Sequence, residues 1–254
     1  MNKPLIMGIL NVTPDSFFDG GAHTNPVAHA AQLIKEGADI IDIGGESTRP
    51  GASVVSPADE AARIIPVLKQ IRLMCPKITI SIDTYKAATA LASAQHGADI
   101  INDPSGLADP ELAKIAAKHN RKLIIMHTRG TPQTMNTLTN YTDILAEITE
   151  FFKEKAALAT NLGVPPENII IDPGFGFAKT KEQNLFLLEN ISHFKALQYP
   201  LLIALSRKRF LSRKEGDTAA DRLQATLEAN AKATAQGADM LRVHDVAATT
   251  DYLK

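Results

Sequence analysis

The sequence predicts an α/β fold made of one domain, residues 1–254, and three observations support this prediction. Eight strand-sized apolar runs alternate with longer amphipathic segments of helical spacing. A Gly-Ala-Asp tripeptide recurs where a helical segment meets an apolar run. No Pro/Ser-rich linker or low-complexity block divides the chain. Because alternating strands and helices form parallel strands with crossover helices, eight such units predict a single TIM (β/α)8 barrel.

The strand predictions follow the chain in order. The eight apolar runs are residues 5–10, 40–43, 78–82, 100–101, 123–126, 169–171, 201–205 and 240–243. Helical spacing between them is clearest over residues 27–36, 58–73, 141–162 and 219–236. The first run ends in Asn11-Val12-Thr13-Pro14 and lacks the glycine-rich fingerprint that follows the first strand of a doubly wound sheet. This ending and the number of runs favour the barrel.

The repeated tripeptide gives the spacing of the units. It begins at Gly37, Gly97 and Gly237, with intervals of 60 and 140 residues. Each glycine stands where a helix C-cap is expected. The intervals correspond to two and four βα units of about 30 to 35 residues, so the units fill the whole chain.

Composition narrows the class of ligand. The formal net charge is −1, which gives no electrostatic reason to expect nucleic acid or an anionic membrane surface as a partner. The single cysteine, Cys75, cannot form an internal disulfide, which suits a reducing compartment. No stretch has the pattern of a signal peptide or the length of a membrane span. We therefore expect a cytoplasmic protein that acts on small molecules.

Polar residues follow every apolar run, at the barrel end where active sites lie. They include Asn11, Asp42, Asp83, Asn102, His127, Asp172, Ser206, Lys208, Arg242 and His244. Any one of them is equally well explained as a cap or turn residue. Several carboxylates that converge on one cavity need a ligand rich in hydrogen-bond donors. A 2-amino-4-oxo pyrimidine edge fits Asp83, Asn102 and Asp172.

Cations are concentrated after the last two runs, where barrels often bind phosphate. Lys208 and Arg242 stand next to strand ends and are the expected ligand contacts, whereas Arg209, Arg213 and Lys214 are expected to be solvated. Alternation would point Arg242 and His244 to the same side, with Val243 packed behind. No C-x-x-C, H-E-x-x-H or His-rich pattern predicts a tight transition-metal site.

Two loops are rich in Gly and Pro, residues 44–51 and 172–177. They are either simple turns or places where an anion meets exposed backbone N–H groups. Residues 11–25 and 129–140 form connections longer than a βα unit needs, which is typical of active-site lids.

Taken together, the motifs resemble the dihydropteroate synthase family from the first strand to the start of the last helix. They are Asn11-Val12-Thr13-Pro14-Asp15-Ser16-Phe17, Asp42-Ile43-Gly44-Gly45-Glu46-Ser47-Thr48-Arg49-Pro50-Gly51, Ile101-Asn102-Asp103, Asp172-Pro173-Gly174-Phe175-Gly176-Phe177, Ser206-Arg207-Lys208 and Arg242-Val243-His244-Asp245. Pro104, Ala178 and Arg209 depart from the family's pattern.

The resemblance implies an enzyme of folate biosynthesis. It would condense 6-hydroxymethyl-7,8-dihydropterin diphosphate with 4-aminobenzoate, releasing diphosphate and 7,8-dihydropteroate, and sulfonamides would compete with the aminobenzoate. The family also implies a homodimer and Mg²⁺, with Asn11 as the protein contact to the metal.

The resemblance assigns the site residues to three neighbouring subsites. The pterin ring would lie on Asp83, Asn102, Asp172 and Lys208, with Met126 beneath it. The diphosphate would lie among Asn11, Arg49, Arg242, Val243 and His244, with Arg242 also stacked on the ring. The aminobenzoate pocket would be shaped by Thr48, Pro50, Gly176, Phe177 and Ser206.

The chemistry of the bond that breaks agrees with these roles. Ionisation of the pterin-CH2-O bond produces a ring cation and a diphosphate anion, and both charges need stabilising before the amine attacks. Asn11, Asp83, Lys208, Arg242 and His244 are therefore the expected catalytic residues.

Two alternatives remain open from the sequence. A pterin-binding methyltetrahydrofolate methyltransferase would use a similar carboxylate and asparagine pocket without a diphosphate clamp. A non-catalytic pterin-binding barrel is also possible, because a fold by itself does not prove an activity. The clamp motifs Thr48-Arg49-Pro50, Ser206-Arg207-Lys208 and Arg242-Val243-His244 favour the synthase.

Overall fold

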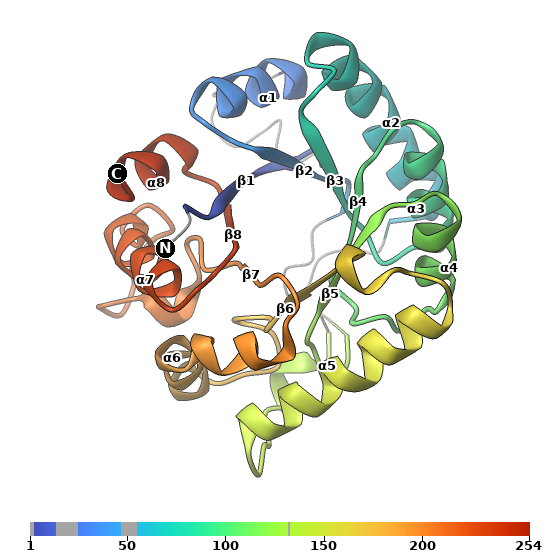
Figure 1. Ribbon diagram of the computed structural model, residues 1–254. Helices are drawn as coiled ribbons and strands as arrows, with labels where there is room; N and C mark the ends of the chain where they lie inside the picture. Colours follow the sequence, from blue (N-terminus) through green and yellow to red (C-terminus); the bar gives the residue numbers. More distant parts are fainter. Residues whose placement is uncertain (1–2, 14–24, 47–54, 132) are drawn as a thin grey trace.

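Eight parallel strands form a ring that is surrounded by helices, with both chain ends on the same side of the molecule (Figure 1). The computed structural model describes residues 3–13, 25–46, 55–131 and 133–254. The strand order is β6-β5-β4-β3-β2-β1-β8-β7, and a parallel bridge between Ile171 and Leu201 joins the two ends of this order. The sheet is therefore a (β/α)8 barrel, as the sequence predicts.

The elements follow the predicted order closely. The strands are β1 (Leu5–Asn11), β2 (Ile40–Gly44), β3 (Thr79–Asp83), β4 (Ile100–Asp103), β5 (Lys122–Met126), β6 (Ile169–Asp172), β7 (Leu202–Ile203) and β8 (Met240–Val243). The helices are α1 (Pro26–Lys35), α2 (Pro57–Met74), α3 (Ala87–Gln95), α4 (Glu111–Lys118), α5 (Ile144–Asn161), α6 (Lys181–Glu189), α7 (Leu223–Ala235) and α8 (Val246–Tyr252). Strand β7 is shorter than its apolar run, because Leu201 contributes only an isolated bridge.

The repeated Gly-Ala-Asp tripeptide is a structural device. Gly37, Gly97 and Gly237 have φ angles of 103°, 98° and 93°, the left-handed conformation that ends a helix and that glycine adopts without strain. The aspartate that follows each glycine accepts a hydrogen bond from a backbone N–H at the start of the neighbouring strand. The bonds run from Ile6 to Asp39 (2.8 Å), from Ile80 to Asp99 (2.9 Å) and from Leu201 to Asp239 (2.8 Å). The tripeptide therefore joins neighbouring βα units.

The barrel interior is filled in layers. Its lower layer is one apolar cluster that takes a residue from seven strands: Met7, Ile40, Ile100, Ile124, Ile170, Leu202 and Met240. Successive residues of a strand point to opposite faces, so the residue two positions later points inward again, nearer the C-terminal end. On five of these strands that residue is Asp42, Asn102, Met126, Asp172 or Arg242. The apolar layer is thus the floor of a polar mouth.

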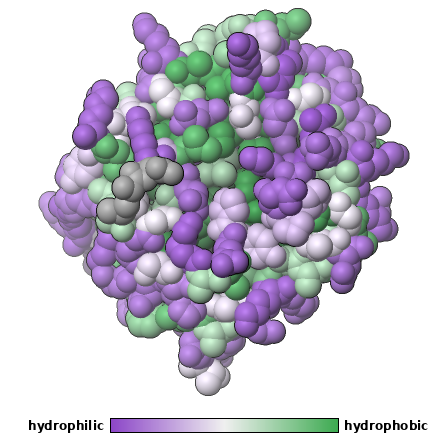
Figure 2. Space-filling view, in the orientation of Figure 1, coloured by the Kyte–Doolittle hydropathy of each residue, from purple (hydrophilic) through white to green (hydrophobic). Residues whose placement is uncertain are grey.

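The outer face of the barrel is covered by the helices. A β-carbon on Gly8 of β1 would lie 3.2 Å from Val246 of α8 and 3.3 Å from Leu33 of α1, so glycine permits this close packing. Hydrophilic side chains cover most of the face in Figure 2, with hydrophobic groups near its centre. Within the described residues, no helix is both long enough and apolar enough to span a bilayer.

Candidate active site

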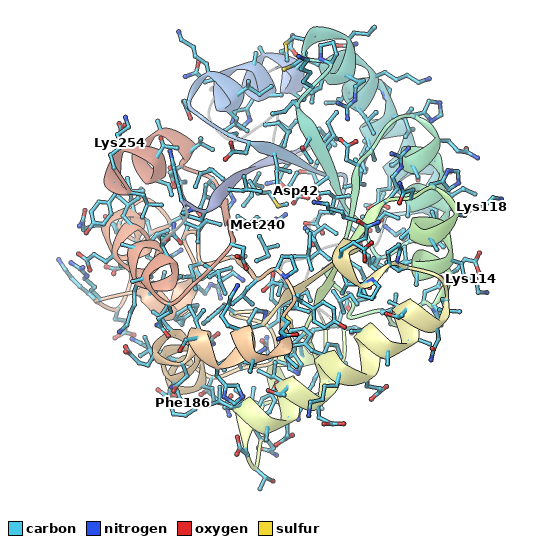
Figure 3. All side chains as sticks on the ribbon, in the orientation of Figure 1. Asp42, Lys114, Lys118, Phe186, Met240 and Lys254 are labelled. Atoms are coloured by element: carbon cyan, nitrogen blue, oxygen red, sulfur yellow. The ribbon has the colours of Figure 1, made fainter. Side chains whose placement is uncertain are left out.

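Arg242 bridges two carboxylates at the barrel mouth. Its Nε donates to Asp42 Oδ2 and its Nη2 donates to Asp83 Oδ2, both at 2.6 Å. Asn102 Nδ2 lies 3.3 Å from Asp42 Oδ2. Asp42 is fully buried, and Figure 3 shows it inside the ring of strands near Met240. A cation, two carboxylates and an amide thus meet at the barrel mouth.

Burial and the neighbouring charges shift the pKa values of Asp83 and Arg242. Burial raises the pKa of Asp83 to about 7, Arg242 opposes the rise, and Asp42 adds to it. Burial disfavours the charge on Arg242, but Asp42 and Asp83 outweigh this effect, so its pKa lies above the usual value. Arg242 is therefore a permanent cation, whereas Asp83 can change its protonation state near neutral pH.

Asp172 and Lys208 lie on the other side of the mouth. Asp172 ends β6, and its Oδ1 accepts a hydrogen bond from Gly174 N at 2.8 Å. Burial raises the pKa of Asp172, while Lys208 opposes the rise. Lys208 Nζ donates to the Phe175 carbonyl and lies 4.8 Å from the centre of the Phe177 ring. Burial lowers the pKa of Lys208 to about 8.

Ser206 and His244 face each other across the ends of β7 and β8. The Ser206 Oγ accepts a hydrogen bond from His244 N at 3.1 Å and lies 3.0 Å from His244 Nδ1. Among the other cations after β7, Arg209, Arg213 and Lys214 are exposed, as the sequence predicts. Arg207 is paired with Asp245, and the exposed Arg213 is paired with Glu228, as expected for a solvated residue.

Oxygen donors flank Gly44, the last residue of β2. A β-carbon on Gly44 would lie 3.6 Å from Asn11 Oδ1 and 3.8 Å from Asp83 Oδ2. The described residues contain no cluster of three or more His, Cys, Asp and Glu side chains that could form a complete metal cage. One or two protein oxygens beside a phosphate-binding space suit Mg²⁺, which commonly keeps waters and takes its other ligands from a phosphate.

The structure brings most of the predicted site residues together at the C-terminal ends of the strands. Those that it describes are Asn11, Asp83, Asn102, Met126, Asp172, Gly176, Phe177, Ser206, Lys208, Arg242, Val243 and His244. Val243 is buried behind the mouth, as alternation predicts. Thr48, Arg49 and Pro50 lie outside the described residues, as does most of the predicted lid over residues 11–25.

Sequence reasoning left two residues of this region out of the site. Asp42 was noted as a strand-end residue but received no role, although its place two residues after Ile40 marks it as facing inward. Lys179 is the second such residue, because its Nζ lies 3.0 Å from the Gly174 and Phe177 carbonyls in the turn after β6. No sequence pattern distinguishes Lys179 from a solvated lysine.

Comparison with known proteins extends over nearly the whole chain. A family model described as "Pterin binding enzyme" matches residues 7–244. The dihydropteroate synthase of Synechocystis sp. is 46% identical over 257 residues, which cover 99% of this chain and 89% of that protein. Two solved structures are similar as well. Xanthomonas albilineans dihydropteroate synthase with 4-aminobenzoic acid has a TM-score of 0.91 at 39% identity, covering 99% of this chain and 91% of that one. Yersinia pestis dihydropteroate synthase with a sulfonamide drug has a TM-score of 0.93 at 38% identity, covering 99% and 92%.

Proposed function

The chain belongs to the dihydropteroate synthase family of pterin-binding enzymes, and on this premise we propose how its residues share the work of the synthase. The observation that carries the proposal is the polar layer formed by the buried Asp42, Asn102 and Asp172 and the partly buried Arg242, directly above an apolar floor. A flat heterocycle rich in hydrogen-bond donors could lie on the apolar floor with its edge against these polar side chains. The relatives named above are synthases, which favours this function over a methyltransferase.

The pterin contacts the carboxylate side of the mouth. Asp172 accepts hydrogen bonds from the 2-amino edge, and Asn102 and Lys208 contact the remaining ring heteroatoms. Asp83 lies near the ring nitrogens, and Met126 supports one face of the ring. Because these side chains are buried or partly buried, leaving their polar groups without a ligand costs more than it would in water, and the cost is relieved when the pterin binds.

The diphosphate occupies the cationic side. Arg242 and His244 contact its oxygens together with Arg49, which lies outside the described residues. Asn11 would hold Mg²⁺ at the edge beside Gly44, where the ion would neutralise charge on the leaving diphosphate. Arg242 contributes a charge that does not depend on pH in the working range, because its two carboxylate partners keep it protonated.

The reaction then proceeds by ionisation. The C–O bond between the pterin methylene and the diphosphate breaks, and its electron pair leaves with the diphosphate. The positive charge that remains is spread over the pterin ring beside Asp83, whose carboxylate stabilises this charge when it is ionised. The amine of 4-aminobenzoate attacks the methylene, an N–C bond forms, and the nitrogen loses a proton to give 7,8-dihydropteroate.

The aminobenzoate enters against the turn after β6. Gly176 and Phe177 form its wall, and Ser206 receives the carboxylate from the opposite side. Thr48 and Pro50 complete the pocket from the part of the chain outside the described residues. The Xanthomonas relative was solved with 4-aminobenzoic acid and the Yersinia relative with a sulfonamide, which supports a pocket that sulfonamides share.

The chain is further proposed to act as a homodimer in the cytoplasm. Leu185 and Phe186 on the outer surface of α6 are 40% and 50% exposed, an adjacent apolar pair that a second copy would cover (Figure 3). Light scattering of the purified protein measures the mass directly, and a monomer at micromolar concentration would contradict the dimer.

The test of the function is a coupled diphosphate-release assay. The complete reaction contains the pterin diphosphate, 4-aminobenzoate and Mg²⁺, and three further reactions omit one component each. We expect release to require all three, with 7,8-dihydropteroate detected as the second product. Release that does not depend on 4-aminobenzoate would overturn the condensation.

A further inference from the structure

The turn that joins β6 to α6 is tightly wound. Gly174, Gly176 and Ala178 have φ angles of 67°, 78° and 48°, so three of five consecutive residues are left-handed. A β-carbon on Gly174 would lie 1.9 Å from the His127 carbonyl oxygen, which only glycine avoids. Glycine adopts this conformation without strain, but Ala178 carries a β-carbon and keeps it only where its surroundings hold the backbone.

Lys179 supplies that support from beneath. The residue is 9% exposed, and its Nζ lies 3.0 Å from three polar groups: the Gly174 carbonyl, the Phe177 carbonyl and His127 Nδ1. Burial lowers the pKa of Lys179 well below its usual value. Even a neutral amine has two protons, one for each of the two carbonyls. Lys179 therefore ties the two ends of the segment 174–177 to the end of β5.

His127 is a fixed partner for this contact. Burial, together with the nearby charges of Lys179 and Arg129, lowers the pKa of His127 to about 2, so the ring is neutral. The ring packs edge-on against Phe151 at 4.9 Å, and His127 N donates to the Asp172 carbonyl at 2.8 Å. The His127 ring is thus held in place by its own strand and by an aromatic neighbour.

We infer that Lys179 is a positioning residue for the aminobenzoate half of the site, acting through the backbone of Gly174 and Phe177. The inference rests on the proposed function, in which Gly176 and Phe177 form the wall of that half. Lys208 approaches the same segment from the mouth, because its Nζ contacts the Phe175 carbonyl and lies over the Phe177 ring. Lys179 and Lys208 thus contact the segment 174–177 from two sides.

The pterin half depends less on Lys179. Asp172 belongs to β6 and is paired with Met126 of β5 in the strand ladder, so its position follows from the sheet. Its carboxylate contacts Gly174 N, whereas Lys179 contacts the carbonyl of the same residue. Loss of Lys179 should therefore weaken the binding of 4-aminobenzoate much more than the binding of the pterin. A general loss of stability would weaken both.

The test compares Lys179→Met with Lys181→Met. Methionine keeps an apolar stem of similar length and removes the nitrogen with its N–H donors. Lys181 is a neighbouring exposed lysine whose Nζ donates to Ser212 O at 3.2 Å and, among the described residues, makes no hydrogen bond to the segment 174–177. We expect Lys179→Met to raise the KM for 4-aminobenzoate at least about tenfold, since displacement of a site by 1 Å can cost 10²-fold. The Kd of an unreactive 6-hydroxymethylpterin, measured by calorimetry, should change less than about twofold by the same reasoning. Lys181→Met should change neither quantity.

Two outcomes would overturn the inference: an unchanged KM for 4-aminobenzoate in Lys179→Met, or an equal loss of affinity for both substrates. If Lys179→Met does not fold, Tyr141→Phe replaces it, because the Tyr141 hydroxyl donates to the Ala178 carbonyl at 3.0 Å and holds the end of the same turn. Tyr141→Phe should also raise the KM for 4-aminobenzoate, by a smaller factor than Lys179→Met. An unchanged KM in this variant would also contradict the inference. Failure of the proposed function is separate, since the wild-type chain would then release no diphosphate.

Discussion

Arg242 and Asp83 are 159 positions apart in the chain and 2.6 Å apart at the barrel mouth. The same guanidinium also binds Asp42, so the diphosphate side and the pterin side of the site share one cation. The family resemblance assigns Asp83 to the pterin and Arg242 to both the pterin ring and the diphosphate. In the structure, the contact couples the group proposed to stabilise the leaving anion to the group proposed to stabilise the ring cation.

Removing Arg242 should damage folding as well as catalysis. Arg242→Ala leaves Asp42 buried without its cation, and breaking one partner of a buried pair costs about 3–5 kcal/mol. Chemical denaturation would show this loss. The double variant Asp42→Asn with Arg242→Met should recover most of the stability while diphosphate release stays at least about 100-fold low, the size of effect seen for one lost preorganised donor. Full activity in the double variant would contradict the role of Arg242.

The rate should fall in alkaline solution because Lys208 loses its charge. Burial lowers the pKa of Lys208 to about 8, so the ammonium form predominates below that pH and disappears above it. The kcat/KM for the pterin diphosphate, which reports groups of the free enzyme, should decline as the pH rises through about 8. Lys208→Arg keeps the charge and should move this decline to higher pH, and a decline at the same pH would assign it to another group.

Acid should destabilise the fold through His127. Its pKa is about 2 in the folded state and 6.5 as an ordinary histidine, so the unfolded chain binds a proton between these values and the folded chain does not. Stability is therefore lost as the pH falls below 6.5, by about 2 kcal/mol between pH 7 and pH 5 from this group alone. Urea denaturation at both pH values measures the loss. His127→Asn should reduce the difference, and an identical difference in this variant would show that other groups cause it.

Ala178 is a position where glycine should be better. Its φ of 48° is left-handed, a conformation that costs a residue with a β-carbon about 1–2 kcal/mol, part of which glycine returns through its greater freedom when unfolded. Ala178→Gly should raise the free energy of unfolding by up to about 1 kcal/mol. The control is Ala157→Gly on the exposed face of α5, which should lower it by about 1 kcal/mol. A loss of stability in both variants would contradict the account of the turn.

The fold could be predicted from the sequence because its signals are local. Strand-sized apolar runs, helical spacing and the repeated Gly-Ala-Asp each arise within a few residues, and they indicate parallel βα units wherever they occur. Asn102 and Asp172 could be placed at the mouth for the same reason, since each directly follows an apolar run. Strand β7 was predicted too long because an apolar run does not show where ladder pairing stops.

The sequence by itself determined the barrel, the end at which the site lies and the residue types that reach it, because these depend on the periodicity of short segments. Only the tertiary structure decided which of these residues touch. Arg242 meets Asp42 and Asp83 because closure of the barrel brings β8 beside β1, close to the ends of β2 and β3. Lys179 contacts the turn after β6 and also His127, which lies 52 positions away in the sequence at the end of β5. Contacts of this kind depend on strand register and on packing across the barrel, which no local pattern encodes.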